Sequence, residues 1–423
     1  MEIIADLHIH GRFSRATSKQ LTIENLEKYA RIKGVNLMGT GDFTHPEWIK
    51  ELKQALADDG TGIFRTKSGY PFVLQTELSL IYTDLGRGRK VHNIVLAPDF
   101  DVVSQITEYL LTKGRIDYDG RPIFKIPCHE FVESLRKISD KIEVIPAHCW
   151  TPHFGLFGSE SGYDKIEDAF KDQTKHIHAL ETGLSSDPPM NWRISALDKY
   201  ALVSNSDLHS FWPWRLGREA TLLDIKLSYD NILKALKTKE GLNGTLEFWP
   251  HEGKYHFSGH RACNVCLSPK ESIKVKDICP VCGRTLTVGV AERVEELADR
   301  PEGFKPECAK PFKNLIPLSE LIAGMIKSSV ATKKVWIEYN KLVKVFKNEM
   351  NILLNVDEVE LKKVTSEKIA EIIIKNRKQE LIVKPGYDGV YGEPVFDKNE
   401  MKKEKVLITK GNIQQKSISD FSQ

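Results

Sequence analysis

The stretch Ile3-Ile4-Ala5-Asp6-Leu7-His8-Ile9-His10 is a short apolar run that ends in two histidines. Such a run predicts a β-strand. Side chains two residues apart on a strand point to the same side, so both imidazoles can reach one metal ion. The arrangement recurs along the first half of the chain. Five further apolar runs each end in a carboxylate or an imidazole: 35–41 before Asp42, 71–76 before Glu77, 144–147 before His148, 178–180 before Glu181, and 201–206 before the pair Asp207 and His209.

Helical patterns separate these runs. Thr22 is a candidate N-cap and Gly34 a candidate stop for one helix, and Pro46 opens another that extends to Leu56. Strands and helices that alternate through residues 1–225 predict a parallel α/β barrel. Because the active sites of such barrels lie at the C-terminal ends of the strands, the six strand-end positions are expected to converge. A convergent set of His, Asp and Glu predicts a multinuclear metal site in a hydrolase.

A single histidine at a strand end is more often a hydrogen-bonded core residue than a metal ligand. The same chemistry at six strand ends argues against that interpretation. His92 is weaker evidence, because it lies inside the strand-like run Lys90–Leu96 rather than at its end. A ligand and a core residue both remain open for it.

Length and charge limit the classes of protein. At 423 residues the chain can hold two or three domains with packed cores. It has no apolar run approaching about 18 residues and no N-terminal secretory pattern, so we expect a cytoplasmic protein without a membrane span. Residues 1–225 carry 27 Lys and Arg against 31 Asp and Glu, and the remainder carries 34 against 27. The basic second half suits a nucleic acid partner, although a Lys-rich solvated surface explains it equally well.

Four of the seven cysteines form two Cys-x-x-Cys pairs, Cys263 with Cys266 and Cys279 with Cys282. Two such pairs can place four thiolates around one zinc ion, so we predict a structural zinc that contributes folding energy to a segment with little apolar content. His256, His260 and Cys308 are spare candidates. This cysteine pattern suits a reducing compartment rather than a disulfide framework.

The alternation of strands and helices ends near residue 225. We expect a connecting segment at 226–258, a zinc-binding domain at 259–310, a mainly helical domain at 311–397 and a flexible tail at 398–423. The elements expected in the helical domain are helices over 318–326, 332–351 and 365–378 and a turn-rich strand pair over 384–392.

Several motifs resemble those of the polymerase and histidinol phosphatase (PHP) superfamily, namely Asp6-Leu7-His8-Ile9-His10, Gly41-Asp42, Glu77, Pro146-Ala147-His148 and Ser206-Asp207-Leu208-His209. This resemblance implies a distorted (β/α)7 PHP barrel in residues 1–225 that hydrolyses phosphoesters. It also implies two or three divalent metals, zinc with manganese or magnesium as alternatives.

A narrower resemblance is to the endonuclease Q family of archaeal and some bacterial DNA-repair nucleases. It rests on the four-cysteine module together with residues 293–301 and 384–392. That likeness extends over nearly the whole chain and implies double-stranded DNA with damaged bases as the partner. The implied reaction is a nick on the 5′ side of deaminated bases (uracil, hypoxanthine, xanthine) and abasic sites, which leaves a 3′-hydroxyl and a 5′-phosphate.

The chain departs from the superfamily in two places. Phe43 follows Asp42 where a histidine is usual, and Ala16 stands where a further histidine often lies. Asp42 and His45 are therefore alternatives for a third metal position. Either Glu77 or Asp207 would bridge two metals, and these two residues with His8 are the predicted catalytic residues. The complete predicted ligand set is His8, His10, Asp42, His45, Glu77, His92, His148, Glu181, Asp207 and His209.

Candidate DNA contacts follow the metal motifs. Arg12, Arg15 and Lys19 could clamp phosphates, unless they are solvated surface charges. An enzyme that reads a damaged base must flip it out of the duplex and fill the gap. Two aromatic loops are candidates for the pocket wall or the wedge, with ordinary packing as the alternative: one holds Trp150 and Phe154, the other Trp212 and Trp214.

Two other functions compete with the nuclease. A small-molecule phosphatase of the histidinol-phosphate type needs neither the zinc module nor the basic second half, so both features argue against it. A DNA-binding scaffold with a degenerate site does not need the near-complete ligand set, which argues against that function.

The last residues of the chain suggest a second partner. Gln415, Ile418 and Phe421 resemble the sliding-clamp (PCNA) interaction motif, whose spacings of three suit a single 3₁₀ turn. Ser422 departs from that motif, where a second aromatic residue is usual.

Overall fold

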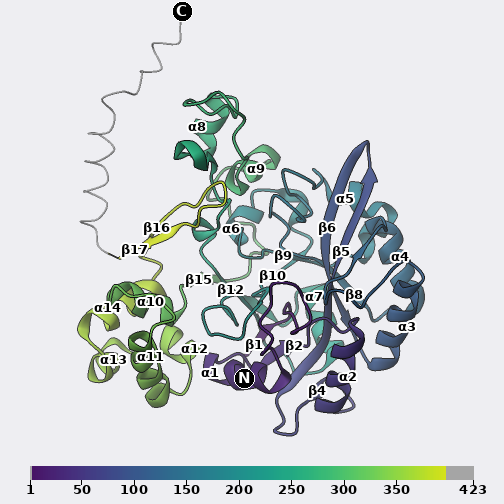
Figure 1. Ribbon diagram of the computed structural model, residues 1–423, viewed down its shortest axis with the longest axis horizontal. Helices are drawn as coiled ribbons and strands as arrows, with labels where there is room; N and C mark the ends of the chain where they lie inside the picture. Colours follow the sequence, from purple (N-terminus) through teal and green to yellow (C-terminus); the bar gives the residue numbers. More distant parts are fainter. Residues whose placement is uncertain (1, 397–423) are drawn as a thin grey trace, which may run out of the picture.

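The computed structural model describes residues 2–396 and contains one large mixed sheet (Figure 1). The predicted clamp-binding residues Gln415, Ile418 and Phe421 lie outside this part of the chain. The strands of the sheet are Ile3–Asp6 (β1), Leu37–Gly39 (β2), Ala57–Asp58 (β3), Phe64–Arg65 (β4), Pro71–Asp84 (β5), Arg87–Ala97 (β6), Ile123–Phe124 (β7), Glu143–Pro146 (β8), Ala220–Leu223 (β11), Leu242–Glu247 (β12) and Phe312–Asn314 (β15). Their order is β15-β12-β11-β1-β2-β5-β4-β3, with β6 and β7 paired to β5 and β8 paired to β6.

The predicted α/β class is confirmed, but the sheet is mixed rather than parallel. β1, β2 and β5 are parallel neighbours, and so are Ala179–Glu181 (β9) and Ala201–Val203 (β10), whereas β6 runs antiparallel to both β5 and β8. Apolar side chains of β1, β2, β5, β6, β8, β9 and β10 meet in one cluster, against which helix Tyr229–Thr238 (α7) packs. Among the described residues no ladder joins β8 to β9.

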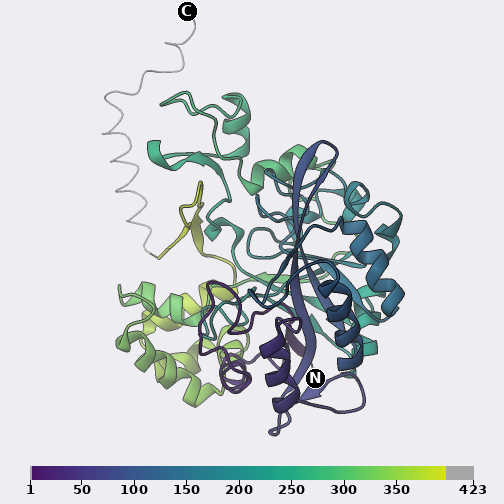
Figure 2. The ribbon, with the colours of Figure 1, turned by 45° about the vertical axis from the view of Figure 1, so that its right-hand side comes forward.

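The β5–β6 hairpin is a long ribbon that lies beside the outer helices (Figures 1 and 2). The sequence predicted that a strand over 71–76 ends at Glu77, but β5 continues through Glu77 to Asp84. Leu85 and Gly86 then turn the chain with φ angles of 51° and 71°, the left-handed backbone that tight hairpins require. Glu77 therefore projects from the middle of a rigid strand.

Two helices confirm the capping signals read from the sequence. Helix Ile23–Lys33 (α1) follows Thr22, whose side chain accepts a hydrogen bond from Asn25 N, and ends at Gly34 in the left-handed conformation. Helix Pro46–Ala55 (α2) begins at the predicted proline. The remaining helices of this half are Phe100–Leu111 (α3), Cys128–Ile138 (α4), Ile166–Phe170 (α5) and Pro188–Asn191 (α6).

A helical unit lies beside α1 at the edge of the molecule (Figure 1). Its apolar side chains form a cluster of their own, and Asn348 caps a helix inside the span that the sequence predicted as one helix over 332–351. Lys33 of α1 and Glu349 form a buried ion pair of 2.7 Å that joins the unit to the main sheet region. Its helices are Leu318–Met325 (α10), Lys333–Phe346 (α11), Glu349–Leu354 (α12), Glu358–Val364 (α13) and Glu367–Arg377 (α14).

The cysteine module comprises residues 258–297, with strands Ser258–His260 (β13) and Val265–Leu267 (β14) and helices Pro269–Lys274 (α8) and Val290–Leu297 (α9). A strand pair is present as predicted, but its strands, Ile382–Lys384 (β16) and Glu393–Val395 (β17), flank the predicted span 384–392. The pair lies between this module and the helical unit (Figure 1). Asp388 in its turn accepts hydrogen bonds from Arg261 N and Thr287 Oγ1, which fastens the module. Within residues 2–396, no helix combines the length and apolarity needed to cross a membrane.

Candidate metal centre

Two groups of ligand side chains share Glu77. His8, His10, Glu77 and Asp207 form one group and Glu77, His92 and His148 form the other, and in each the ligand atoms lie within 4.8 Å of one another. Glu77 Oε2 is 3.1 Å from His10 Nε2, and Oε1 is 2.8 Å from His92 Nδ1. Of the two bridging candidates, the geometry favours Glu77, because each of its oxygens faces a different group. These six side chains are called the metal centre below.

Strained backbone accompanies the side chains at the strand ends. Asp42, His148 and Asp207 have φ angles of 43°, 32° and 47°, in the left-handed region that non-glycine residues seldom adopt. Each such residue costs on the order of 1–3 kcal/mol and persists only where its surroundings hold it. Positions of this kind concentrate at functional sites.

Asp42 and Glu181 support histidines instead of joining either group. Asp42 Oδ1 lies 3.0 Å from His10 Nδ1, and Glu181 Oε2 lies 3.0 Å from His8 Nδ1. Glu181 also accepts a hydrogen bond from His148 N. A carboxylate on the outer nitrogen of a histidine sets its tautomer and ring orientation. The predicted direct ligation by Asp42 and Glu181 therefore differs from the contacts in the structure.

The other two predicted ligands lie at the margin. His45 caps α2, accepting a hydrogen bond from Glu47 N, and stacks on Phe13 with ring centroids 4.6 Å apart. His209 packs against the His10 ring at 4.7 Å and is one-third exposed. Neither residue belongs to a ligand group, nor does Asp42, so the third metal position stays unassigned within residues 2–396.

The donor set fits divalent cations. His8 Nε2 is buried without a hydrogen-bond partner, 3.5 Å from Glu77 Oε2 and 3.7 Å from Asp207 Oδ1. Burial acts to lower the pKa of His8, but Glu181, Glu77 and Asp207 outweigh it and raise that pKa well above its usual value. Burial lowers the pKa of His92 to about 4, which keeps its imidazole neutral and able to bind a metal.

Arg121 is a residue of the site that no sequence motif marks. Its Nη1 lies 3.0 Å from Glu77 Oε2, and the side chain is 26% exposed. It precedes β7, and only the pairing of β7 with β5 brings it to Glu77. A sheet register of this kind cannot be read from local sequence.

The two predicted aromatic loops have different surroundings. Trp150 is 1% exposed and donates a hydrogen bond from Nε1 to Asn191 Oδ1, so it is a core residue rather than a DNA contact. Phe154 is half-buried, and its ring lies 4.4 Å from that of His92. Of the two predicted residues in this loop, Phe154 therefore borders the metal centre and Trp150 does not.

Trp212 and Trp214 stack on each other at 5.2 Å, and both contact Trp336 of α11. They pack the loop after Asp207 against the helical unit, as the packing alternative predicts. Trp212 is nevertheless 36% exposed, so a DNA contact by this loop stays a prediction. The predicted phosphate clamps lie at the surface. Arg12 pairs with Glu51 and Arg15 with Asp119, while Lys19 is exposed.

In the cysteine module, Cys263, Cys279 and Cys282 come together with His260, and Cys266 is absent from the group. Cys282 Sγ lies 3.3 Å from His260 Nδ1. His260 pairs directly with Val265 across the hairpin, so both face Cys279, which packs against Val265. Cys266 follows Val265 and points to the opposite face. His260, a spare candidate in the sequence, thus occupies the place predicted for Cys266.

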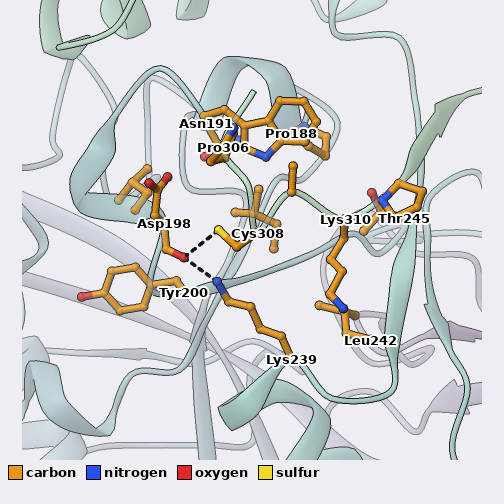
Figure 3. Close-up of a pocket in the computed structure, with 15 residues that line it drawn as sticks. Pro188, Asn191, Asp198, Tyr200, Lys239, Leu242, Thr245, Pro306, Cys308 and Lys310 are labelled. Atoms are coloured by element: carbon orange, nitrogen blue, oxygen red, sulfur yellow. Dashed lines mark hydrogen bonds between the residues drawn. The ribbon is translucent and has the colours of Figure 1, made fainter. Parts of the chain in front are cut away.

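A separate cavity of about 40 Å³ lies where residues 306–311 pack on β10 and β12 (Figure 3). Cys308 Sγ and Lys239 Nζ both donate to the carbonyl oxygen of Asp198 there. Its walls are mainly apolar, and a cavity of this volume has room for only a few water molecules. A nucleotide cannot enter it, so the metal centre remains the candidate functional site.

Comparison with known proteins identifies relatives of the whole chain. The lesion-specific endonuclease PfuEndoQ from Pyrococcus furiosus is 32% identical, with a TM-score of 0.85 over 95% of this chain and 97% of that one. A structure of endonuclease Q with a 27-mer duplex substrate carrying an abasic lesion at the active site gives 32% identity and a TM-score of 0.84, over 95% of this chain and 98% of that one.

Two curated relatives carry no assigned activity. The uncharacterized protein YqxK of Bacillus subtilis is 30% identical over 415 residues, covering 93% of this chain and 99% of YqxK. The uncharacterized protein MJ0043 of Methanocaldococcus jannaschii is 33% identical over 308 residues, which are 70% of this chain but 37% of MJ0043. Residues 317–380 match the family described as the MJ0043 C-terminal domain. The helical unit of this chain thus has a counterpart in a much longer protein.

Proposed function

The chain belongs to the endonuclease Q family, and from this premise we propose that it is a metal-dependent DNA-repair endonuclease. It nicks double-stranded DNA on the 5′ side of uracil, hypoxanthine, xanthine and abasic sites, and leaves a 3′-hydroxyl and a 5′-phosphate. The observation that carries the proposal is the pair of ligand groups that share Glu77. The abasic duplex bound to the related endonuclease Q supports the abasic substrate.

The residues of the metal centre would bind two cations. His8, His10 and Asp207 would hold one cation, His92 and His148 a second, and Glu77 both. Imidazole nitrogens beside carboxylate oxygens favour zinc or manganese over magnesium, which prefers oxygen ligands. When bound, such a pair of ions supplies an activated water and neutralises charge on the phosphoryl group.

The protein contributes orientation to this chemistry. Asp42 and Glu181 hold the outer nitrogens of His10 and His8, so that the inner nitrogens face the shared carboxylate. Asp207 is 21% exposed and lies on the open side of the centre, where a phosphodiester can approach. The scissile phosphate is therefore expected to lie on the Asp207 side of the metal centre, because Glu77 is fully buried.

Phe154 is a candidate for reading the lesion because it borders the metal centre. A flipped nucleotide stacks on aromatic side chains, and the Phe154 ring lies against His92 of the metal centre. An unpaired or damaged base costs less to extrude than a paired one, which favours lesions over intact duplex.

A single assay tests the proposed function. End-labelled duplexes that carry one uracil, one hypoxanthine or one abasic site are incubated with the protein, with and without a chelator. We expect a chelator-sensitive nick 5′ to each lesion and none in the intact duplex. Phosphate release from histidinol phosphate without nicking would instead establish a small-molecule phosphatase, and no turnover of either substrate would leave a DNA-binding scaffold.

A sliding clamp is a second proposed partner. Gln415, Ile418 and Phe421 supply the motif, and a clamp would raise the effective concentration of the enzyme at DNA.

A further inference from the structure

Arg121 lies where a substrate phosphate must arrive. Resting on the proposed function, we propose that its guanidinium binds the non-bridging oxygens of the scissile phosphate. One edge of the side chain contacts Glu77 of the metal centre at 3.0 Å, and 26% of the side chain is open to solvent. The residue therefore connects the buried ligands with the face from which DNA approaches.

The sheet register aims Arg121 at this position. β7 runs parallel to β5, with Ile123 opposite Ser79. Arg121 and Glu77 each lie two residues earlier in their segments, and Pro122 O accepts a hydrogen bond from Ser79 N at 3.1 Å, which extends the pairing. Side chains two residues apart in a strand point to the same side. The register thus places Arg121 beside Glu77.

The loop that carries Arg121 is anchored to the metal centre. The Asp119 carboxylate accepts hydrogen bonds from the backbone nitrogens of both Arg121 and Arg15. A side chain at Gly120 would overlap Asp42 Oδ2 and Ser14 Oγ, so this position requires glycine. Because Asp42 also orients His10, the loop packs on the support of the metal centre itself. Arg121 is preorganised rather than a mobile surface charge.

The substrate adds negative charge to the metal centre that the metal ligands cannot balance and Arg121 can. Glu77, Asp207, Asp42 and Glu181 carry four negative charges when ionised, which two divalent cations would balance. The phosphodiester adds one negative charge, and the attacking hydroxide adds another in the transition state. An arginine supplies positive charge, and its planar fork matches two phosphate oxygens.

Glu77 alone does not account for the position of Arg121. Glu77 Oε2 also faces His10 Nε2 at 3.1 Å, so the oxygen that pairs with Arg121 belongs to a ligand group. That oxygen cannot serve a cation and the guanidinium equally. Arg121 therefore needs a second anion in the working site, and the substrate phosphate provides it.

The test measures binding to two duplexes by fluorescence anisotropy, with the full chain carrying Asp207→Asn to prevent cleavage. Both duplexes contain one abasic site, and one has a neutral methylphosphonate at the scissile linkage. We expect Arg121→Gln to weaken binding to the phosphate duplex about tenfold or more, which corresponds to the loss of a charged hydrogen bond. Binding to the methylphosphonate duplex should change less than about twofold, since the charge that Arg121 contacts is already missing.

Three controls separate contact from structure. Arg115→Gln removes an exposed arginine of the same loop, paired with Asp117, and should leave both affinities unchanged. Arg121→Lys keeps the charge without the fork and should give an intermediate loss. Metal content should be the same with and without Arg121→Gln. Lower metal content would mean that Arg121 acts through Glu77 and would overturn the proposal.

The remaining outcomes distinguish this inference from the proposed function. Equal weakening on both duplexes, or no weakening on either, overturns the phosphate contact. If the wild type fails to nick the abasic duplex, the proposed function itself fails. If the wild type nicks and Arg121→Gln binds like its parent, only the role of Arg121 is lost.

Discussion

The metal centre and the cysteine module both gather metal-binding side chains, but the protein around them differs. The strands that carry the metal centre pack into the large apolar clusters of the main sheet, and carboxylates hold the outer nitrogens of His8 and His10. The module has a buried apolar cluster of three residues, Val265, Cys279 and Leu286, and Cys282 is exposed.

This difference separates two uses of metal. Where a core and supporting carboxylates position the ligands in advance, a bound ion is free to serve chemistry. Where the apolar core is small, binding of the ion provides folding energy. Loss of metal should therefore abolish activity at the first site and lower stability at the second.

Removal of a metal ligand should have the largest effect. We expect Asp207→Asn and His8→Ala to abolish nicking of a uracil duplex while lesion-DNA binding remains detectable, because base recognition depends on the loops. Gel assays at several metal concentrations check the first result and anisotropy the second. His45→Gln is the control, since His45 caps α2 outside the ligand groups. Near-normal cleavage by both ligand variants would remove the metal-site hypothesis.

The supporting carboxylates should matter less than the ligands. We expect Asp42→Asn and Glu181→Gln each to cost about 10–100-fold in nicking rate or metal affinity, because the histidine rings lose their orientation. Metal titrations of nicking rate measure both quantities. Glu51→Gln, which removes an acidic partner of Arg12 away from the ligands, is the matched control. Rates equal to wild type for both variants would show that the rings need no support.

Acid should weaken metal binding at the metal centre. The raised pKa of His8 and His10 means that a cation must displace protons, so zinc affinity should fall by up to about tenfold per pH unit for each proton as pH decreases. Equilibrium dialysis between pH 6 and 8 measures this. The folding stability of the metal-free protein should show the opposite pH dependence. Protonated His8 and His10 stabilise the fold at low pH, and this contribution disappears as pH rises through their raised pKa values. Zinc affinity independent of pH would contradict both expectations.

Loss of a zinc ligand in the cysteine module should lower stability rather than abolish nicking. We expect Cys279→Ser to remove one zinc and lower the melting temperature, with nicking reduced only through weaker DNA binding. Cys308→Ser, an exposed cysteine outside the module, should change neither. Because His260 occupies the position facing Cys279, His260→Asn should release more zinc than Cys266→Ser. The reverse order would establish the four-cysteine set predicted from the sequence.

The smallest expected effect concerns the clamp. Ile418→Ala with Phe421→Ala should leave nicking of short duplexes unchanged and weaken binding to the cognate sliding clamp in a calorimetric titration. The motif departs from the usual pattern at Ser422, so wild-type affinity should be modest. Equal clamp binding by both proteins would sink this proposal.

Local patterns predicted much of the fold. Apolar runs located β1, β2, β8, β9 and β10 to within a few residues, and capping residues located α1 and α2. They failed where pairing was not local. The continuation of β5 past Glu77 depends on its partner β6, and the break between α11 and α12 depends on Asn348 and the buried pair of Glu349 with Lys33.

The sequence by itself determined which chemistry the chain can perform, because His, Asp and Glu side chains at six strand ends already indicated a shared metal site. The tertiary structure decided the role of each. It turned Asp42 and Glu181 toward outer nitrogens, made Glu77 common to two groups, placed Arg121 beside it and turned Cys266 away from Cys279. The reason is physical: residue type follows from one position in the chain, whereas the direction of a side chain depends on the register of strands that are far apart in sequence.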